Sequence, residues 1–141
     1  MRRLKFLTRD DLRFMKISMR CQWLEIKWVS SNAQRRADTG NAVLAKLSRL
    51  LDRLVGQPTP YIADHEQRLW VQHSIGMLQS RIALDLGRLD DATTYATEFN
   101  DCFQLLLNLA AEEGMIADDP ELWKRLSQSN KDRYDEVTAA H

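Results

Sequence analysis

The residues in this chain most able to bind a ligand share one side of a predicted helix. Their steps of three or four place them on a single line, which we call the basic ridge. The ridge consists of Arg13, Lys16, Arg20, Trp23 and Lys27, and Arg35 and Arg36 follow it along the chain. Lys and Arg neutralise phosphates or carboxylates, and an interleaved indole can stack on a base. The ridge therefore predicts a surface for an anion or an acidic partner; the alternative is a solvated face that meets acidic helices.

A second candidate site is a line of small and polar residues in the middle of the chain. It contains His73, Gly76, Ser80 and Ala83, again at steps of three and four. Small residues at this spacing form a shallow groove on a helix. A ligand could lie in that groove with His73 and Ser80 as polar contacts. The alternative is a close helix crossing with a hydrogen-bonded histidine in the core.

The sequence contains none of the common catalytic or metal-binding motifs. His65, His73 and His141 belong to no HExxH or paired ExxH pattern, and no P-loop, GxSxG or GxGxxG occurs. Cys21 and Cys102 lie within apolar patterns and have no neighbour in sequence that would activate a thiol. We therefore expect no enzymatic activity, no metal and no cofactor. The cysteines are expected to be buried reduced thiols, with a single disulfide as the alternative.

Charge is divided unevenly along the chain although the formal net charge is zero. Residues 1–56 carry thirteen Lys and Arg against five Asp and Glu, whereas residues 57–141 carry seven against fifteen. This split indicates an anionic partner for the basic part, or pairing of opposite faces. A length of 141 residues with 44% hydrophobic residues suits one globular domain. The absence of a long apolar run or a signal peptide predicts a cytoplasmic protein that does not enter a membrane.

Residues 42–86 predict two helices joined by a rigid turn. Asn41 is a candidate N-cap for a helix whose apolar residues recur at steps of three and four and which ends at Gly56. After the QPTP turn, Pro60 suits the first position of a long helix. That helix should run to Leu86 and end at Gly87.

The remainder of the chain predicts two more helices. The first begins at Asp90 or Asp91 as the N-cap and stops at Gly114. The second begins at Asp118-Asp119-Pro120. Its apolar pattern thins after Ser129, so we expect the end of the chain to fray.

The first 36 residues permit two interpretations. As a helix, they carry one apolar stripe of Leu12, Met15, Met19, Ile26, Val29 and Ala33. A second stripe consists of Phe14, Ile17, Cys21, Leu24 and Trp28. A helix with two such stripes must be clamped between neighbours, which leaves the basic ridge exposed. As a strand, residues 15–23 alternate apolar and polar without fault; residue types and the lack of a second strand favour the helix.

The strand interpretation carries a resemblance to a known family. It orders the elements as strand Met15–Cys21, helix Trp23–Arg36, turn Thr39-Gly40-Asn41 and helix Ala42–Val55. This order resembles that of the ribbon-helix-helix DNA-binding proteins, in which two chains pair their strands. The resemblance implies that Lys16, Ser18 and Arg20 enter the major groove. It also implies that the alternate strand residues, Ile17, Met19 and Cys21, face the core.

These patterns together predict an all-α single domain of about five helices over residues 1–141, with a basic part (1–56) and an acidic part (57–141). The predicted function is that of a small non-enzymatic regulatory or adaptor protein that binds a protein partner through charged helical faces, either as a monomer or as a homodimer. The alternative is a nucleic-acid-binding regulator that contacts DNA or RNA through its basic part. Trp28 and Trp123 are candidates for interface anchors or for core residues.

Overall fold

The protein is a bundle of α-helices. The computed structural model describes residues 9–55 and 65–139, and every regular element within these residues is helical. The helices are α1 (Arg9–Val29), α2 (Arg36–Val55), α3 (His65–Asp85), α4 (Leu89–Glu112), the four-residue α5 (Met115–Asp118) and α6 (Pro120–Thr138). The predicted all-α fold is therefore confirmed, with five long helices and one short one.

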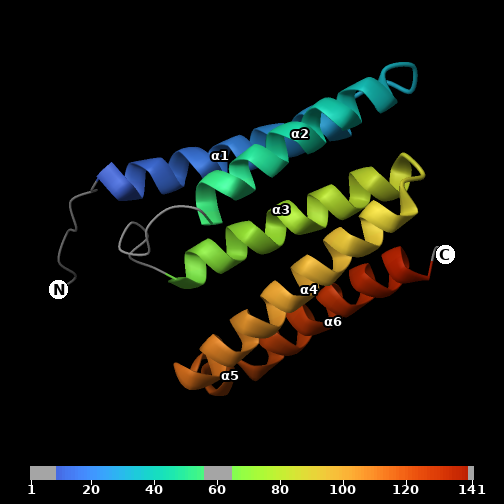
Figure 1. The fold of residues 1–141 in the computed structure, drawn as a ribbon. Helices are drawn as coiled ribbons and strands as arrows, with labels where there is room; N and C mark the ends of the chain where they lie inside the picture. Colours follow the sequence, from blue (N-terminus) through green and yellow to red (C-terminus); the bar gives the residue numbers. More distant parts are fainter. Residues whose placement is uncertain (1–8, 56–64, 140–141) are drawn as a thin grey trace.

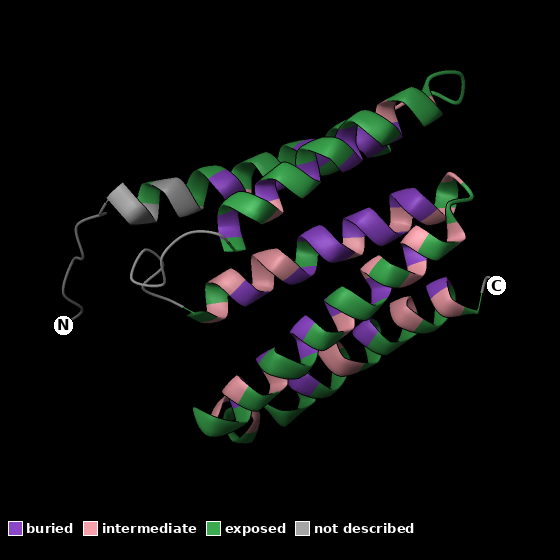
Figure 2. Cartoon of the chain, viewed as in Figure 1, coloured by how far each residue is buried: buried purple, intermediate pink, exposed green. Residues whose placement is uncertain are grey.

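Helix α3 lies in the middle of the bundle (Figure 1). The hairpin of α1 and α2 covers one side of α3, and α4 covers the other side. Helix α6 packs mainly against α4 and makes a smaller contact with α3. Burial follows this order, because α3 is buried along much of its length whereas α1 and α2 are largely exposed on their outer sides (Figure 2).

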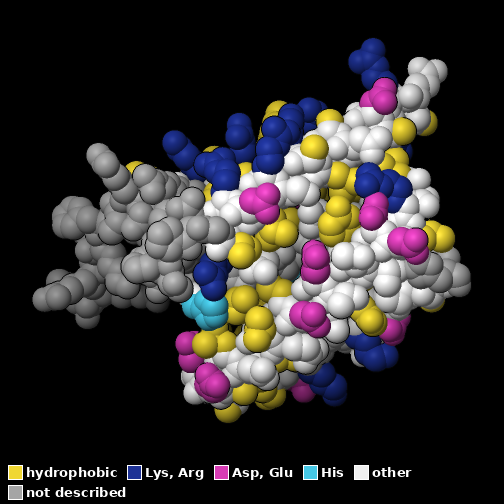
Figure 3. Space-filling view, viewed as in Figure 1, with side chains coloured by type: hydrophobic (Ala, Val, Ile, Leu, Met, Phe, Trp, Pro, Cys, Tyr) yellow, Lys and Arg dark blue, Asp and Glu magenta, His cyan; other side chains and the backbone are white. Residues whose placement is uncertain are grey.

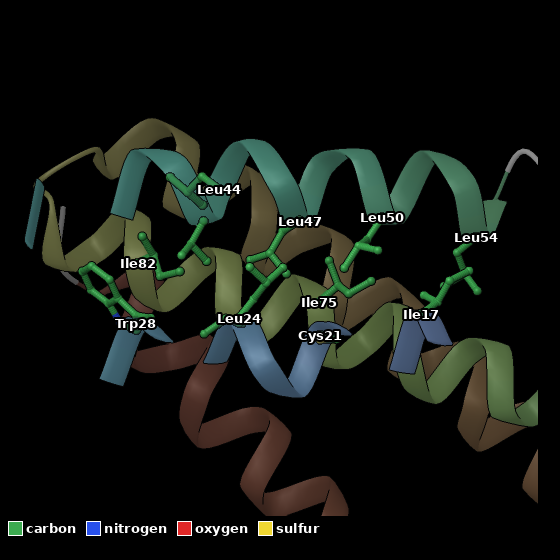
Figure 4. Packing of buried hydrophobic residues seen from close by; sticks show 12 residues of the cluster. Ile17, Cys21, Leu24, Trp28, Leu44, Leu47, Leu50, Leu54, Ile75 and Ile82 are labelled. Carbon is green, nitrogen blue, oxygen red and sulfur yellow. The ribbon is translucent and has the colours of Figure 1, made fainter. Parts of the chain in front are cut away.

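One core cluster joins α1, α2 and α3 (Figure 4). Its members are Ile17, Cys21, Leu24, Trp28, Val43, Leu44, Leu47, Leu50, Leu54, Ile75, Leu78 and Ile82. Each aliphatic side chain that is fully buried here stabilises the fold by about 1.5–3 kcal/mol. At one end of the cluster Gly40 lets α2 approach closely, since a Cβ there would lie 2.9 Å from the Trp28 ring. This packing fixes which side of α1 faces inward.

A second apolar region joins α3, α4 and α6. Phe99 and Phe103 of α4 are almost fully buried, and Val137 of α6 belongs to the same apolar cluster as Phe99. At Gly76 a Cβ would lie 2.9 Å from the Phe99 Cβ, so α3 and α4 cross with almost no space between them. The glycine in α3, which disfavours helix by about 1 kcal/mol relative to Ala, is thus explained by this close approach.

The predicted C-terminal ends of α3 and α4 and the predicted start of α6 are confirmed at their turns. Gly87 and Gly114 have φ angles of 74° and 75°, a left-handed conformation that favours glycine. Asp119 caps α6 by accepting a hydrogen bond of 3.1 Å from the Leu122 N–H, and Pro120 is the first helical residue. The predicted Asp cap of α4 is wrong, because α4 begins at Leu89 and its N-cap residue Arg88 provides no side-chain cap.

The N-terminal part settles the choice between helix and strand. Residues 15–23 lie within α1, so the strand interpretation is wrong. The ribbon-helix-helix order is wrong as well, because the turn lies at residues 30–35 and not at 39–41. Asn41 is not an N-cap, since α2 begins at Arg36. The physical reason is that Thr39 and Gly40 continue the helix, with Gly40 buried against Trp28.

The end of α6 differs from the expected fraying. Helix α6 continues to Thr138, and Asn130 and Val137 are both buried within it. Asn130, Tyr134 and Val137 attach this segment to α3 and α4. Because these residues are widely spaced and one of them is polar, they do not form a dense apolar stripe in the sequence. The expected helix end at Gly56 and the Pro60 start lie outside the described residues.

Candidate partner-binding surface

Helix α1 carries an exposed row of large apolar side chains along its outer side. This outer row consists of Leu12, Met15, Met19, Trp23, Ile26 and Val29, which are 44–65% exposed. Among the described residues, only three other large apolar side chains are comparably exposed, and they lie on three different helices. Scattered exposed apolar residues are ordinary, but a continuous row along one helix marks an interaction surface.

The two apolar stripes of α1 differ in their burial. The stripe containing Ile17, Leu24 and Trp28 is buried against α2 and α3. The opposite stripe forms most of the outer row and is not covered by any described residue. The expectation that neighbours clamp both stripes is therefore met on one side only. A second neighbour is missing from the described part of the chain.

A groove between α1 and α2 adjoins the outer row. One hollow of about 560 Å³ is lined by Lys16, Ile17, Met19, Arg20, Trp23, Leu50 and Arg53. A second, of about 270 Å³, is lined by Arg20, Trp23, Leu24, Lys46, Arg49, Leu50 and Arg53. Because the two hollows share four residues, they form one continuous depression, which we call the basic groove. Met19 and Trp23 belong to both the groove and the outer row.

The electrostatic character of the basic groove is uniformly positive. Its five cations are Lys16, Arg20, Lys46, Arg49 and Arg53, and no carboxylate lines it. None of these five forms an ion pair with a described carboxylate. The ammonium of Lys27 on α1 lowers the pKa of Lys46 on α2, which shows how closely cations approach across the helix pair. Figure 3 shows this gathering of Lys and Arg over α1 and α2.

The basic ridge predicted from the sequence is only partly free to bind a ligand. Lys16, Arg20, Trp23 and Lys27 are exposed on one side of α1. Arg13 lies within α1, but its side chain is outside the described part of the structure.

The two arginines beyond the ridge lie elsewhere. Arg35 is exposed in the turn between α1 and α2 and does not line the groove. Arg36 has a structural role instead, because it pairs with Asp85 at 3.2 Å and its guanidinium lies 4.1 Å from the centre of the Trp28 ring. Arg36 is therefore not part of the candidate surface.

Three groove residues on α2 were missed by the sequence reasoning. Lys46, Arg49 and Arg53 recur at steps of three and four on the exposed side of α2. This spacing was the available signal, but only the packing of α1 against α2 shows that both basic lines face the same groove. The sequence of α1 or of α2 alone does not indicate that these two helices pack against each other in this way.

The small-residue line of α3 is part of the core. His73, Gly76, Ser80 and Ala83 are all buried, and Phe99 of α4 lies against Gly76. The arrangement is a close helix crossing and leaves no open groove for a ligand. The Nε2–H of His73 donates to Asn130 Oδ1 at 2.8 Å, and burial lowers the pKa of the His73 imidazole.

The two cysteines are buried within the described part of the chain. Burial raises the pKa of both the Cys21 and Cys102 thiols to about 11, so both are protonated at neutral pH. They are free and buried, as expected. No group of three or more His, Cys, Asp or Glu in the described part is arranged to hold a metal ion.

Both further tryptophans named as candidate anchors are core residues. Trp28 is 1% exposed and Trp123 is 5% exposed, so neither is available at the surface. Trp23, at 64%, is the exposed tryptophan of the basic groove. Exposed large aromatic residues that line a groove, Trp above all, are typical of binding hot spots.

Comparison with known proteins gives no further guide to this surface. None of the described helices combines the length and apolar character needed to span a bilayer. No protein-family model matches the chain, and searches of curated proteins and of solved structures found no significant similarity.

Proposed function

We propose that the chain is a non-enzymatic regulatory or adaptor protein that binds a protein partner through the outer side of α1. The observation that carries this proposal is the outer row. Its six large apolar side chains are exposed along one helix whose opposite side is fully packed. Full burial of such a side chain contributes about 1.5–3 kcal/mol, and because these six are 44–65% exposed, each contributes about half of that toward offsetting the cost of association.

The adjoining basic groove supplies the second property that a binding protein needs. The cations of the basic groove affect the choice of partner and the rate of association more than they affect the affinity of the complex. An acidic partner is attracted to the groove, whereas a basic one is repelled. The outer row thus supplies most of the affinity, and the basic groove supplies most of the specificity.

The experiment is an affinity capture from the cells in which the protein occurs. It compares the proteins that are retained by the wild type with those retained by variants of two different surfaces. In the test variant Met19→Asp and Ile26→Asp are combined, and in the matched control Leu105→Asp changes an exposed leucine of α4. We expect a partner that the wild type and the control both retain and that the test variant loses. Retention of the same proteins by all three forms would contradict the proposal.

Nucleic-acid binding is the second candidate function, and the basic groove favours it. Five cations without carboxylates around an exposed Trp23 suit phosphates together with a stacked base. The test is a titration of mixed-sequence duplex DNA and single-stranded RNA by fluorescence anisotropy at low and near-physiological salt. Binding that weakens steeply with salt, and that Arg20→Gln with Arg53→Gln abolishes, would favour this function. No binding at low salt would eliminate it.

A further inference from the structure

We infer that the occupant of the α1–α2 surface is an acidic amphipathic helix of a partner protein. This inference rests on the proposed function and deepens it by naming the chemistry of the partner. It follows from the shape of the groove, from its charge and from the length of the outer row. Each of these features constrains the partner in a different way.

The floor and the rim of the groove differ in chemistry. Ile17, Leu24 and Leu50 line the bottom of the groove but are only 2–3% exposed, so most of its accessible apolar surface belongs to Met19 and Trp23, on the side that continues into the outer row. The rim consists of the five cations named above. A ligand that fits must present an apolar ridge between anionic flanks. A helix with apolar residues at steps of three and four and carboxylates beside them has this pattern.

A nucleic acid satisfies only half of these requirements. Its phosphates would meet Arg20, Arg49 and Arg53, but they would leave the exposed apolar surface of Met15, Met19 and Ile26 in water. A second copy of this chain fits less well, because an antiparallel pairing of two outer rows places basic ridges along the same side. Charge complementarity therefore favours a partner that brings carboxylates.

The length of the outer row fits a helix of ordinary size. From Leu12 to Val29 the row spans about 26 Å at 1.5 Å per residue. A partner helix of about 18 residues covers this distance. Long unbranched methionines at positions 15 and 19 adapt to different apolar ridges, as in other surfaces that receive helices.

The test uses the full chain and three synthetic peptides of about 18 residues. One peptide is amphipathic with Leu on one side and Glu on both flanks. The second carries Lys in place of Glu, and the third has the composition of the first in an order without amphipathic periodicity. Binding is measured by fluorescence anisotropy with single-stranded RNA as a competitor, and sedimentation velocity gives the oligomeric state of the protein.

The protein variants separate this surface from others. In the groove variant Arg20→Glu and Arg53→Glu are combined; in the matched control Lys124→Glu and Arg125→Glu change two exposed cations of α6. We expect the acidic amphipathic peptide alone to bind the wild type and the control. The groove variant should bind it about 30-fold or more weakly and should gain affinity for the Lys peptide.

Several results would overturn the inference. The first is that all three peptides bind equally well. The second is that the groove variant still binds the acidic peptide as the wild type does. The third is that the protein forms a stable dimer and that Met19→Asp abolishes this dimer. Binding of none of the three peptides, combined with RNA binding that the groove variant loses, would assign the groove to nucleic acid. If the acidic peptide fails to bind while Met19→Asp with Ile26→Asp still loses a retained partner, the proposed function stands and only the acidic-helix inference fails.

Discussion

At the scale of single residues, His73 is a titratable group buried in the core of the fold. It is buried between α3, α4 and α6, and its only polar side-chain contact in the described structure is Asn130, which in turn donates to Asn100 at 3.0 Å. Phe99, Phe103 and Trp70 surround its ring. No described carboxylate pairs with the ring to stabilise a positive charge there, so the neutral imidazole is the form that fits.

This environment makes stability depend on pH in a defined direction. Burial lowers the pKa of His73 from its ordinary value of 6.5, so the unfolded chain binds a proton before the folded one does. The contribution of this residue is therefore fully present above pH 6.5 and falls as the pH decreases below it, by at most about 1.4 kcal/mol per pH unit. Denaturant unfolding at pH 7.5 and 5.5 measures the effect.

The matched variant for this prediction is His73→Gln, which keeps a donor for Asn130 and cannot gain a charge. We expect the free energy of unfolding of the wild type to decrease more than that of the variant between the two pH values. Equal decreases in both proteins would show that other groups determine the acid sensitivity.

At the scale of elements, α1 combines two apolar sides with opposite roles. Leu24 is 3% exposed in the core, whereas Met19 is 65% exposed on the outer row, although both are large apolar residues of one helix. We therefore expect one side of α1 to determine the stability of the fold and the other side to bind the partner. Substitutions on the two sides should separate these properties.

Thermal and denaturant unfolding test this separation directly. Leu24→Ala removes packing from the core and should lower the free energy of unfolding by about 2–5 kcal/mol. Met19→Ala removes a side chain that contacts mainly solvent and should change it by less than about 0.5 kcal/mol. A cost for Met19→Ala comparable to that for Leu24→Ala would mean that the outer row already packs within the chain.

The elements differ in how far the sequence determines them. The periodicity of α3, α4 and α6 and the turn residues Gly87, Gly114 and Asp119 made these helices predictable, since the signals are local. The start of α2 was not predictable in the same way. Thr39 and Gly40 have the composition of a turn, and only the tertiary contact of Gly40 with Trp28 explains why the helix continues through them.

The candidate site was predictable in part for the same reason. The basic line of α1 was visible as Lys16, Arg20 and Lys27, but its continuation on α2 depends on how two helices pack. Arg36 had the residue type of a binding group and proved to be held by Asp85. The two apolar stripes of α1 have the same periodicity. Only the packing of α2 and α3 determines which of the two faces the core, and the periodicity of α1 does not identify these neighbours.

At the scale of the whole molecule, the charge division corresponds to a spatial one. The basic part contributes α1 and α2, and the acidic part contributes α3, α4, α5 and α6 on the other side of the bundle (Figures 1 and 3). Only the Arg36–Asp85 ion pair links α1 or α2 to the acidic helices among the described residues. Within the described part of the chain the positive surface is therefore left largely unneutralised, which supports the proposed binding of an acidic partner.

The most direct test of the central claim, that the outer side of α1 binds a protein partner, is site-specific photocrosslinking in living cells. A benzophenone amino acid replaces Ile26 in the outer row or, as the control, Leu105 on α4, which is similarly exposed at 55%. We expect a discrete covalent adduct with another protein from position 26 and none from position 105. No adduct at position 26, or the same adducts from both positions, would contradict it.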